Sequence, residues 1–157
     1  MLAVLTLGDE RSRRLVLRGR LDEAAVLVAN AATWAAREVV LDTAEVVFVN
    51  SIGIREWMHL LAALHQGGAT LVHERCAEPL IEQMSFIPAA RGGGEVRSCF
   101  APYLCSACGH EDSVLIDVVA HRAELAAARP PTSPCPRCGA AMALADLPER
   151  WFAFLHA

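Results

Sequence analysis

Residues 46–64 read VVFVNSIGIREWMHLLAAL, and within them the hydrophobic period changes from that of a strand to that of a helix. The first four residues are apolar throughout, which is typical of a strand covered on both faces. From Ser51 the apolar residues recur at helical spacing on one face: Ile54, Trp57, Met58, Leu61 and Leu64. The polar residues lie away from that face: Arg55, Glu56, His59 and Gln66. The stretch therefore predicts a strand followed directly by a helix that begins at Ser51.

The surrounding sequence predicts an α/β fold, a mixed sheet with covering helices, in the order ββαβαβαβ. Strands are expected at residues 2–7, 14–18, 39–49, 69–73 and 95–103. Between the second and third of them, the alanine-rich residues 23–37 predict a helix with Asp22 as its N-cap. Residues 79–84 predict a short helix that begins with a proline.

Three segments together resemble a known family. They are Gly19-Arg20-Leu21-Asp22 before a helix, Val39-Val40-Leu41-Asp42-Thr43, and Phe48-Val49-Asn50-Ser51-Ile52-Gly53-Ile54. This pattern is similar to the STAS domain of bacterial anti-sigma-factor antagonists over about residues 2–100. The resemblance implies a mixed sheet with helices on one side and a non-enzymatic signalling adaptor in transcription control. It also implies a partner, a Ser/Thr kinase that is itself an anti-sigma factor and phosphorylates Ser51.

The helix start has a physical reason to carry such a switch. A helix N-terminus tolerates a phosphate, and a phosphate adds about −1.5 to −2 charges that can repel a docked partner. The expected partner-binding surface comprises Asn50, Ser51, Arg55, Glu56 and His59. Asn50 stands where the family usually has Asp, so a negative charge is lost there while a capping side chain is kept. The alternative is that Asn50 and Ser51 only cap a core helix.

Two C-x-x-C-G motifs lie in the last third of the chain, CSACG at 105–109 and CPRCG at 135–139, with 26 residues between Cys108 and Cys135. Four thiolates in two tight turns are typical of a closed structural Zn²⁺ site with the ligands Cys105, Cys108, Cys135 and Cys138. Iron binding by the same thiolates, a redox pair, and His110 as a replacement ligand are the alternatives. The two other cysteines, Cys76 and Cys99, are expected to be core thiols.

These motifs divide the chain into a STAS-like domain, residues 1–104, and a module that resembles a zinc ribbon with a terminal helix, residues 105–157. A module of this size buries little core, so the metal is expected to supply folding energy. The pattern Asp146-Leu147-Pro148-Glu149 predicts the start of the terminal helix. Its aromatic residues either fasten the module to the first domain or bind a partner: Trp151, Phe152 and Phe154.

Composition narrows the function classes further. All 14 basic residues are arginines, which excludes mechanisms that need a lysine, and the net charge is −4. Two alternative functions are a zinc-ribbon scaffold for protein interactions without a phospho-switch and a nucleic-acid-binding zinc-ribbon regulator. Residues 105–157 hold four arginines against six acidic residues, so the nucleic-acid-binding alternative has no basic stripe to support it. No catalytic motif is found, and we expect no enzyme. The sequence shows neither a signal peptide nor a membrane span, which favours a cytoplasmic protein without membrane contact; a homodimer is compatible with it.

Overall fold

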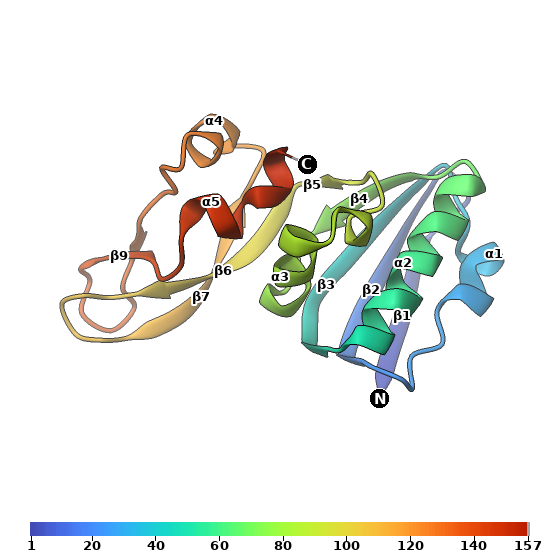
Figure 1. The fold of residues 1–157 in the computed structure, drawn as a ribbon, viewed down its shortest axis with the longest axis horizontal. Helices are drawn as coiled ribbons and strands as arrows, with labels where there is room; N and C mark the ends of the chain where they lie inside the picture. Colours follow the sequence, from blue (N-terminus) through green and yellow to red (C-terminus); the bar gives the residue numbers. More distant parts are fainter. Residues whose placement is uncertain (157) are drawn as a thin grey trace.

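The computed structural model describes residues 1–156 and contains two sheets side by side (Figure 1). The first sheet has the order β1-β2-β3-β4-β5. Its strands are β1 (Leu2–Gly8), β2 (Ser12–Leu21), β3 (Glu38–Val49), β4 (Thr70–Glu74) and β5 (Glu95–Val96). β1 pairs antiparallel with β2, whereas β2, β3, β4 and β5 pair in parallel. The predicted mixed sheet is therefore confirmed.

Helices cover one face of this sheet (Figure 1). They are α1 (Ala31–Trp34), α2 (Ser51–Gln66) and α3 (Glu78–Phe86), with 3₁₀ turns at Val28–Asn30 and Pro88–Ala90. α2 begins at Ser51, as its hydrophobic period predicts, and buries one apolar face: Ile54, Trp57, Leu60, Leu61 and Leu64. The short helix expected at 79–84 is also present, as α3.

The long helix predicted over residues 23–37 is wrong. The segment is a turn and an irregular stretch, followed by the 3₁₀ turn and the four-residue helix α1. Asp22 does not cap a long helix; its carboxylate accepts a hydrogen bond from the N–H of Ala24 and closes a turn. Glu56 of α2 accepts the N–H groups of Leu27 and Val28, both at 2.9 Å, so a tertiary contact satisfies donors that a helix would have used.

The second sheet has the order β7-β6-β9-β8 and is antiparallel. Its strands are β6 (Ser98–Leu104), β7 (Glu111–Asp117), β8 (Ser133–Pro134) and β9 (Ala141–Leu144). The single strand predicted at 95–103 is wrong, because β5 belongs to the first sheet and β6 to the second. The α/β class with a mixed sheet and a C-terminal four-cysteine module is confirmed. The domain boundary at residue 104 stays a prediction. The chain passes from the first sheet to the second before that residue, between β5 and β6.

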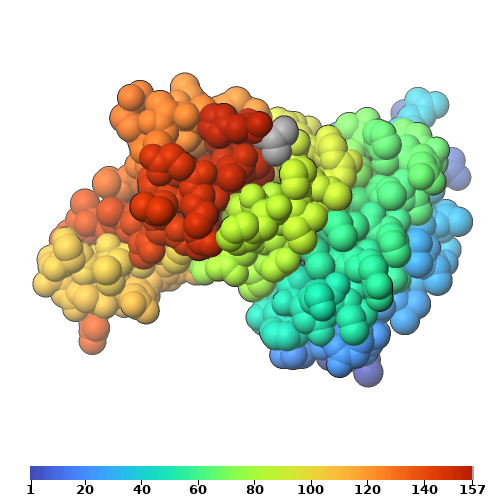
Figure 2. All heavy atoms as spheres, in the orientation of Figure 1, coloured from blue at the N-terminus to red at the C-terminus, as the bar shows by residue number. Residues whose placement is uncertain are grey.

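The end of the chain packs against the first domain. α5 (Pro148–Trp151) and the 3₁₀ turn Ala153–His156 contact α3, and Figure 2 shows these red atoms against the yellow-green ones of α3. Trp151, Phe152 and Phe154 are buried. The Ser85 hydroxyl of α3 donates a hydrogen bond to the Trp151 carbonyl at 3.1 Å. These aromatic side chains therefore join the two sheets into one hydrophobic core, alongside α4 (Arg122–Ala126) through its buried Leu125.

The sheet face opposite the helices carries an ion-pair network instead of a covering layer. Asp42 of β3 is only 3 % exposed. Its carboxylate accepts hydrogen bonds from Arg14 at 3.2 Å and from Arg75 at 2.7 Å. Glu74 pairs with the same Arg14. Because a buried carboxylate needs hydrogen-bonding partners, the two arginines satisfy Asp42, and the network covers part of the face.

His73 of β4 is fully buried, and the structure makes it sensitive to acid. Its Nε2 lies 2.8 Å from the Arg91 carbonyl, so the neutral ring donates its proton there. Burial lowers the pKa of His73 from 6.5 to about 4. Below pH 6.5 His73 therefore binds a proton in the unfolded chain but not in the folded chain. The contribution of His73 to the free energy of unfolding is fully present above pH 6.5 and is lost as the pH falls toward 4.

We expect wild-type protein to lose about 2 kcal/mol more unfolding free energy than His73→Gln between pH 7 and pH 5. Glutamine keeps an N–H donor near the Arg91 carbonyl but does not titrate. Urea unfolding of both proteins at the two pH values measures this difference. The metal site and the carboxylates are the same in both proteins, so their pH-dependent contributions cancel in the comparison. Equal pH dependence in the two proteins would contradict the assignment to His73.

No helix among residues 1–156 combines the length and the apolar character needed to cross a membrane.

Candidate metal centre and partner-binding surface

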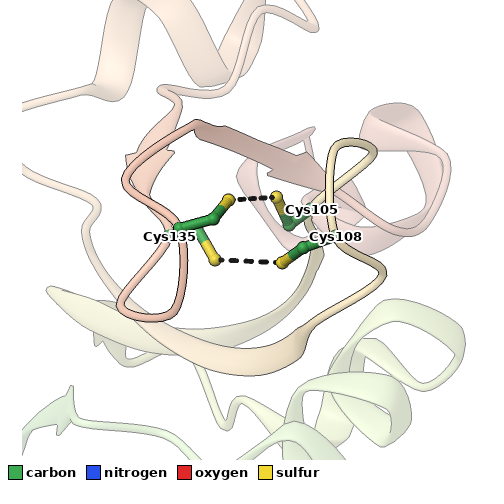
Figure 3. A group of neighbouring side chains, drawn as sticks. Cys105, Cys108 and Cys135 are labelled. Atoms are coloured by element: carbon green, nitrogen blue, oxygen red, sulfur yellow. Dashed lines mark hydrogen bonds between the residues drawn. The ribbon is translucent and has the colours of Figure 1, made fainter.

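The two C-x-x-C-G motifs form matching turns that bring their cysteines together (Figure 3). In the first turn the N–H of Gly109 donates to the Cys105 carbonyl at 2.8 Å, and in the second the N–H of Gly139 donates to the Cys135 carbonyl at 2.9 Å. Gly109 has φ 74° and Gly139 has φ 78°, which is the left-handed conformation that favours glycine. The glycine that follows each second cysteine is therefore required by the turn.

The four sulfur atoms converge. The Sγ atoms of Cys105 and Cys138 are 3.5 Å apart, those of Cys108 and Cys135 are 3.7 Å apart, and all four lie within 4.8 Å of one another. Thiolates around one tetrahedral metal ion at ~2.3 Å would stand about 3.8 Å apart. The donor set therefore fits one metal ion, and no disulfide forms among the cysteines.

The turns also favour negative charge on sulfur. The N–H of Arg137 points to the Cys135 Sγ at 3.4 Å. Backbone hydrogen bonds, that of Cys108 first among them, lower the pKa of Cys105 to about 7. The Ala140 N–H favours the Cys138 thiolate, but the hydrogen bonds with the thiols of Cys105 and Cys108 outweigh it and raise the Cys138 pKa to about 12. A bound cation would favour the thiolate form of all four sulfurs and displace the protons that remain on them.

The remaining titratable groups named by the sequence lie outside this cluster. Cys76 and Cys99 are buried free thiols in the hydrophobic core, which confirms them as core thiols. Their backbones pair as an isolated parallel β-bridge. Burial raises the pKa of Cys76 to about 12 and that of Cys99 well above its ordinary value, so neither is a nucleophile at neutral pH. The Nε2 atom of His110 lies 3.8 Å from an Asp112 carboxylate oxygen, and His110 is not part of the cluster.

The predicted partner-binding residues lie on the first three turns of α2 and just before it. Asn50 caps the helix, because its Oδ1 accepts the N–H groups of Ile52 at 3.1 Å and Gly53 at 2.8 Å. Ser51 is the first helical residue and is exposed, and so are Arg55 and His59.

Glu56 and Asn50 are engaged inside the molecule. Glu56 holds the backbone of residues 27–28, and the Asn50 side-chain N–H donates to Glu23 at 2.8 Å. They order the segment beside the helix start. Ser51, Arg55 and His59 are left as the polar side chains that the surface presents.

Sequence reasoning missed Gly53 and the exposed apolar residues beside Ser51. A Cβ atom at Gly53 would stand 1.9 Å from the Leu21 carbonyl oxygen, so the first turn of α2 touches the end of β2. Val26 and Ile52 are 66 % and 46 % exposed. The glycine two residues after Ser51 is the feature of the sequence that indicates this close approach of two backbones. The hydrophobic period of residues 23–37 does not predict that the Val26 side chain is exposed.

We expect Asn50→Ala to lower the unfolding free energy by about 1 kcal/mol, because two N–H groups of α2 lose their acceptor. Asn50→Ser, which keeps a capping oxygen, is the matched control and should lose less. Urea unfolding at pH 7 measures both changes. An equal loss in the two variants would show that the contact with Glu23, rather than the cap, stabilises this helix start.

No protein-family model matches this chain, and no curated protein matches it.

Proposed function

We propose that the protein is a non-enzymatic signalling adaptor that binds a protein partner through the exposed start of α2. The partner class that fits the STAS resemblance is a kinase or anti-sigma factor. The observation that carries the proposal is the placement of Ser51, exposed in the first turn of a 16-residue helix and flanked by exposed apolar side chains. Soluble proteins leave few such clusters uncovered unless they bind something.

The apolar part of this surface supports a protein partner. Ile52 precedes Glu56 by four residues and so lies on the same side of α2, next to the segment that Glu56 holds. Val26 precedes that segment and Val28 belongs to it, and their side chains are 66 % and 39 % exposed. Ser51 and Arg55 supply hydrogen-bonding groups beside this apolar rim, an arrangement that suits a protein interface.

Phosphorylation of Ser51 is the proposed control. Its hydroxyl stands at the positive end of the helix dipole, where a phosphate is tolerated. Arg55 lies one turn on and can pair with the phosphate. The added charge of about −2 would enter the polar part of the surface and weaken a partner that docks there.

Zn²⁺ is the proposed metal of the cysteine cluster. Four thiolates at tetrahedral spacing leave no position for water or substrate, so the ion would be structural. A bound ion would link the turn that follows β6 to the turn that follows β8. The second sheet would then be a rigid second surface for protein interactions. Metal analysis of purified protein distinguishes zinc from iron.

Affinity purification from the native cell tests the adaptor, with wild type compared against Ser51→Asp and Ser51→Ala. We expect one binder to be lost with Asp and retained with Ala, because only Asp adds charge. Gln66→Asp, which places the same charge at the exposed far end of α2, is the matched control. Incubation of the protein with the captured kinase and ATP should add one phosphate, seen by intact mass and absent from Ser51→Ala.

Binding that survives Ser51→Asp, with no phosphate added by the captured partner, would reduce the protein to a scaffold without a switch. Loss of the binder with Gln66→Asp as well would move the interface away from the helix start.

A further inference from the structure

The outer edge of β1 is an unpaired strand edge. β1 ends the order of the first sheet, and within the described chain no strand pairs with its outer side. Its seven residues pair with β2 in an unbroken register, from Leu2 opposite Gly19 to Gly8 opposite Arg13. A regular strand at a sheet edge presents a row of free N–H and C=O groups to a further strand.

The other sheet edges of the described chain are protected. β5 and β8 have two residues each, and β8 contains Pro134. β7 is as long as β1 but carries three carboxylates: Glu111, Asp112 and Asp117. β1 reads LAVLTLG and has no charged residue and no proline. Short length, charge and proline are the usual means by which an edge avoids pairing, and β1 lacks all three.

We propose that β1 pairs antiparallel with β1 of a second copy of this chain, in the register centred on Leu5, so that two five-stranded sheets become one. Antiparallel pairing about a two-fold axis sets each strand against itself. In this register every residue of Leu2–Gly8 gains a partner, since Leu2 stands opposite Gly8 of the other copy.

The side chains fit this register. Leu5 of one copy stands opposite Leu5 of the other, on the face where Leu5 is 50 % exposed. On the same face Leu7, 49 % exposed, stands opposite the small Ala3. On the other face Val4 stands opposite Thr6, a pair of β-branched residues that favours sheet pairing.

Charge also favours a second copy over a charged partner. The nearest charges on the exposed face are Arg14 and Arg18 of β2, opposite Leu7 and Ala3. Arg14 is paired with Asp42, and Arg18 lies 3.0 Å from Glu45, so both are compensated within their own copy. Arginines of the two copies would be three strand spacings apart, about 14 Å, which exceeds the screening length of about 8 Å. The seam therefore contains no like-charge repulsion.

Sedimentation of the metal-loaded full chain over a wide range of concentration tests the proposal. Wild type should approach twice the chain mass of 16.9 kDa and dissociate on dilution. Leu5→Lys places two ammonium groups opposite each other and should raise the dissociation constant at least about tenfold. Val119→Lys is the matched control, because Val119 is 52 % exposed and lies in the second half of the chain, and it should leave the dimer intact.

A pair of double variants tests the register. Ala3→Lys with Leu7→Lys sets lysine opposite lysine twice and should give a monomer, whereas Ala3→Glu with Leu7→Lys sets opposite charges together and should keep the dimer. Circular dichroism checks that each variant is folded. A monomeric wild type at every concentration, a dimer unaffected by Leu5→Lys, or equal behaviour of the two double variants would overturn the proposal.

Discussion

Replacement of Cys135 by serine is expected to release the bound metal and to unfold the second sheet, residues 98–144, while β2 and β3 keep their structure. Apart from the pairing of β6 with β7 and the core that it shares with the first sheet, the second sheet has few means of support, because β8 has only two residues and β9 pairs with β6 over two residues. Metal binding to four thiolates is worth about 10–16 kcal/mol in small zinc modules. We therefore expect a loss of at least several kcal/mol in the local stability of this sheet.

Hydrogen exchange resolved by segment measures this effect. Amides of β7 and β9 should lose protection in Cys135→Ser, and a chelator should have the same effect on wild type. Trp151 is buried on this side of the core, so its near-ultraviolet signal should weaken too. Elemental analysis should give one metal ion per chain in wild type and none in the variant.

Cys76→Ala is the matched control. It also removes a buried thiol, but Cys76 lies outside the cluster, so the variant should keep its metal even if its overall stability falls. Metal loss from Cys76→Ala, or full protection of β9 in Cys135→Ser, would contradict the assignment of the site.

Gly53→Ala is expected to destabilise the whole first domain by at least about 3 kcal/mol. The new methyl group would stand 1.9 Å from the Leu21 carbonyl oxygen and 2.7 Å from the Asp22 nitrogen, both of them backbone atoms. The Leu21 carbonyl cannot move freely, because it accepts the N–H of Asn50 at 3.1 Å. Relief of the clash would require α2 to tilt away from β2.

Gly67→Ala makes the same chemical change at the other end of α2. Its Cβ would meet carbonyl oxygens at 3.3 Å and 3.4 Å, and Gly67 has an ordinary φ of −73°. We expect the free energy of unfolding to change by about 0.5 kcal/mol or less. Alanine reduces the conformational entropy of the unfolded chain, and this gain offsets the slight crowding in the folded protein. Chemical unfolding compares the two variants, and equal stability would refute a close contact at Gly53.

Gly53→Ala also bears on the proposed function. A tilted α2 would move Ser51 and Arg55 relative to the segment held by Glu56. Partner capture by a folded fraction of the variant should therefore weaken, whereas Gly67→Ala should bind as wild type does.

Local patterns predicted the parts of this molecule whose structure depends on near neighbours. The start of α2 at Ser51 follows from the change of hydrophobic period, and Asn50 caps it as its side chain allows. The two cysteine turns follow from spacing, because each C-x-x-C-G motif closes its own turn with glycine in the left-handed conformation. The STAS resemblance remains a prediction, and so does the phosphorylation of Ser51.

The sequence alone determined that a helix begins at Ser51 and that four cysteines form two matching turns, because each depends on hydrogen bonds within a few residues. Only the tertiary structure decided that residues 23–37 are not one helix, since the Glu56 carboxylate takes the N–H groups of residues 27–28 from a distant part of the chain. It also divided the strand expected at 95–103 between two sheets. Residue propensity and hydrophobic period reflect only the local preference of a segment for helix or strand. Long-range hydrogen bonds and packing override that preference where they satisfy the same backbone donors or bury more apolar surface.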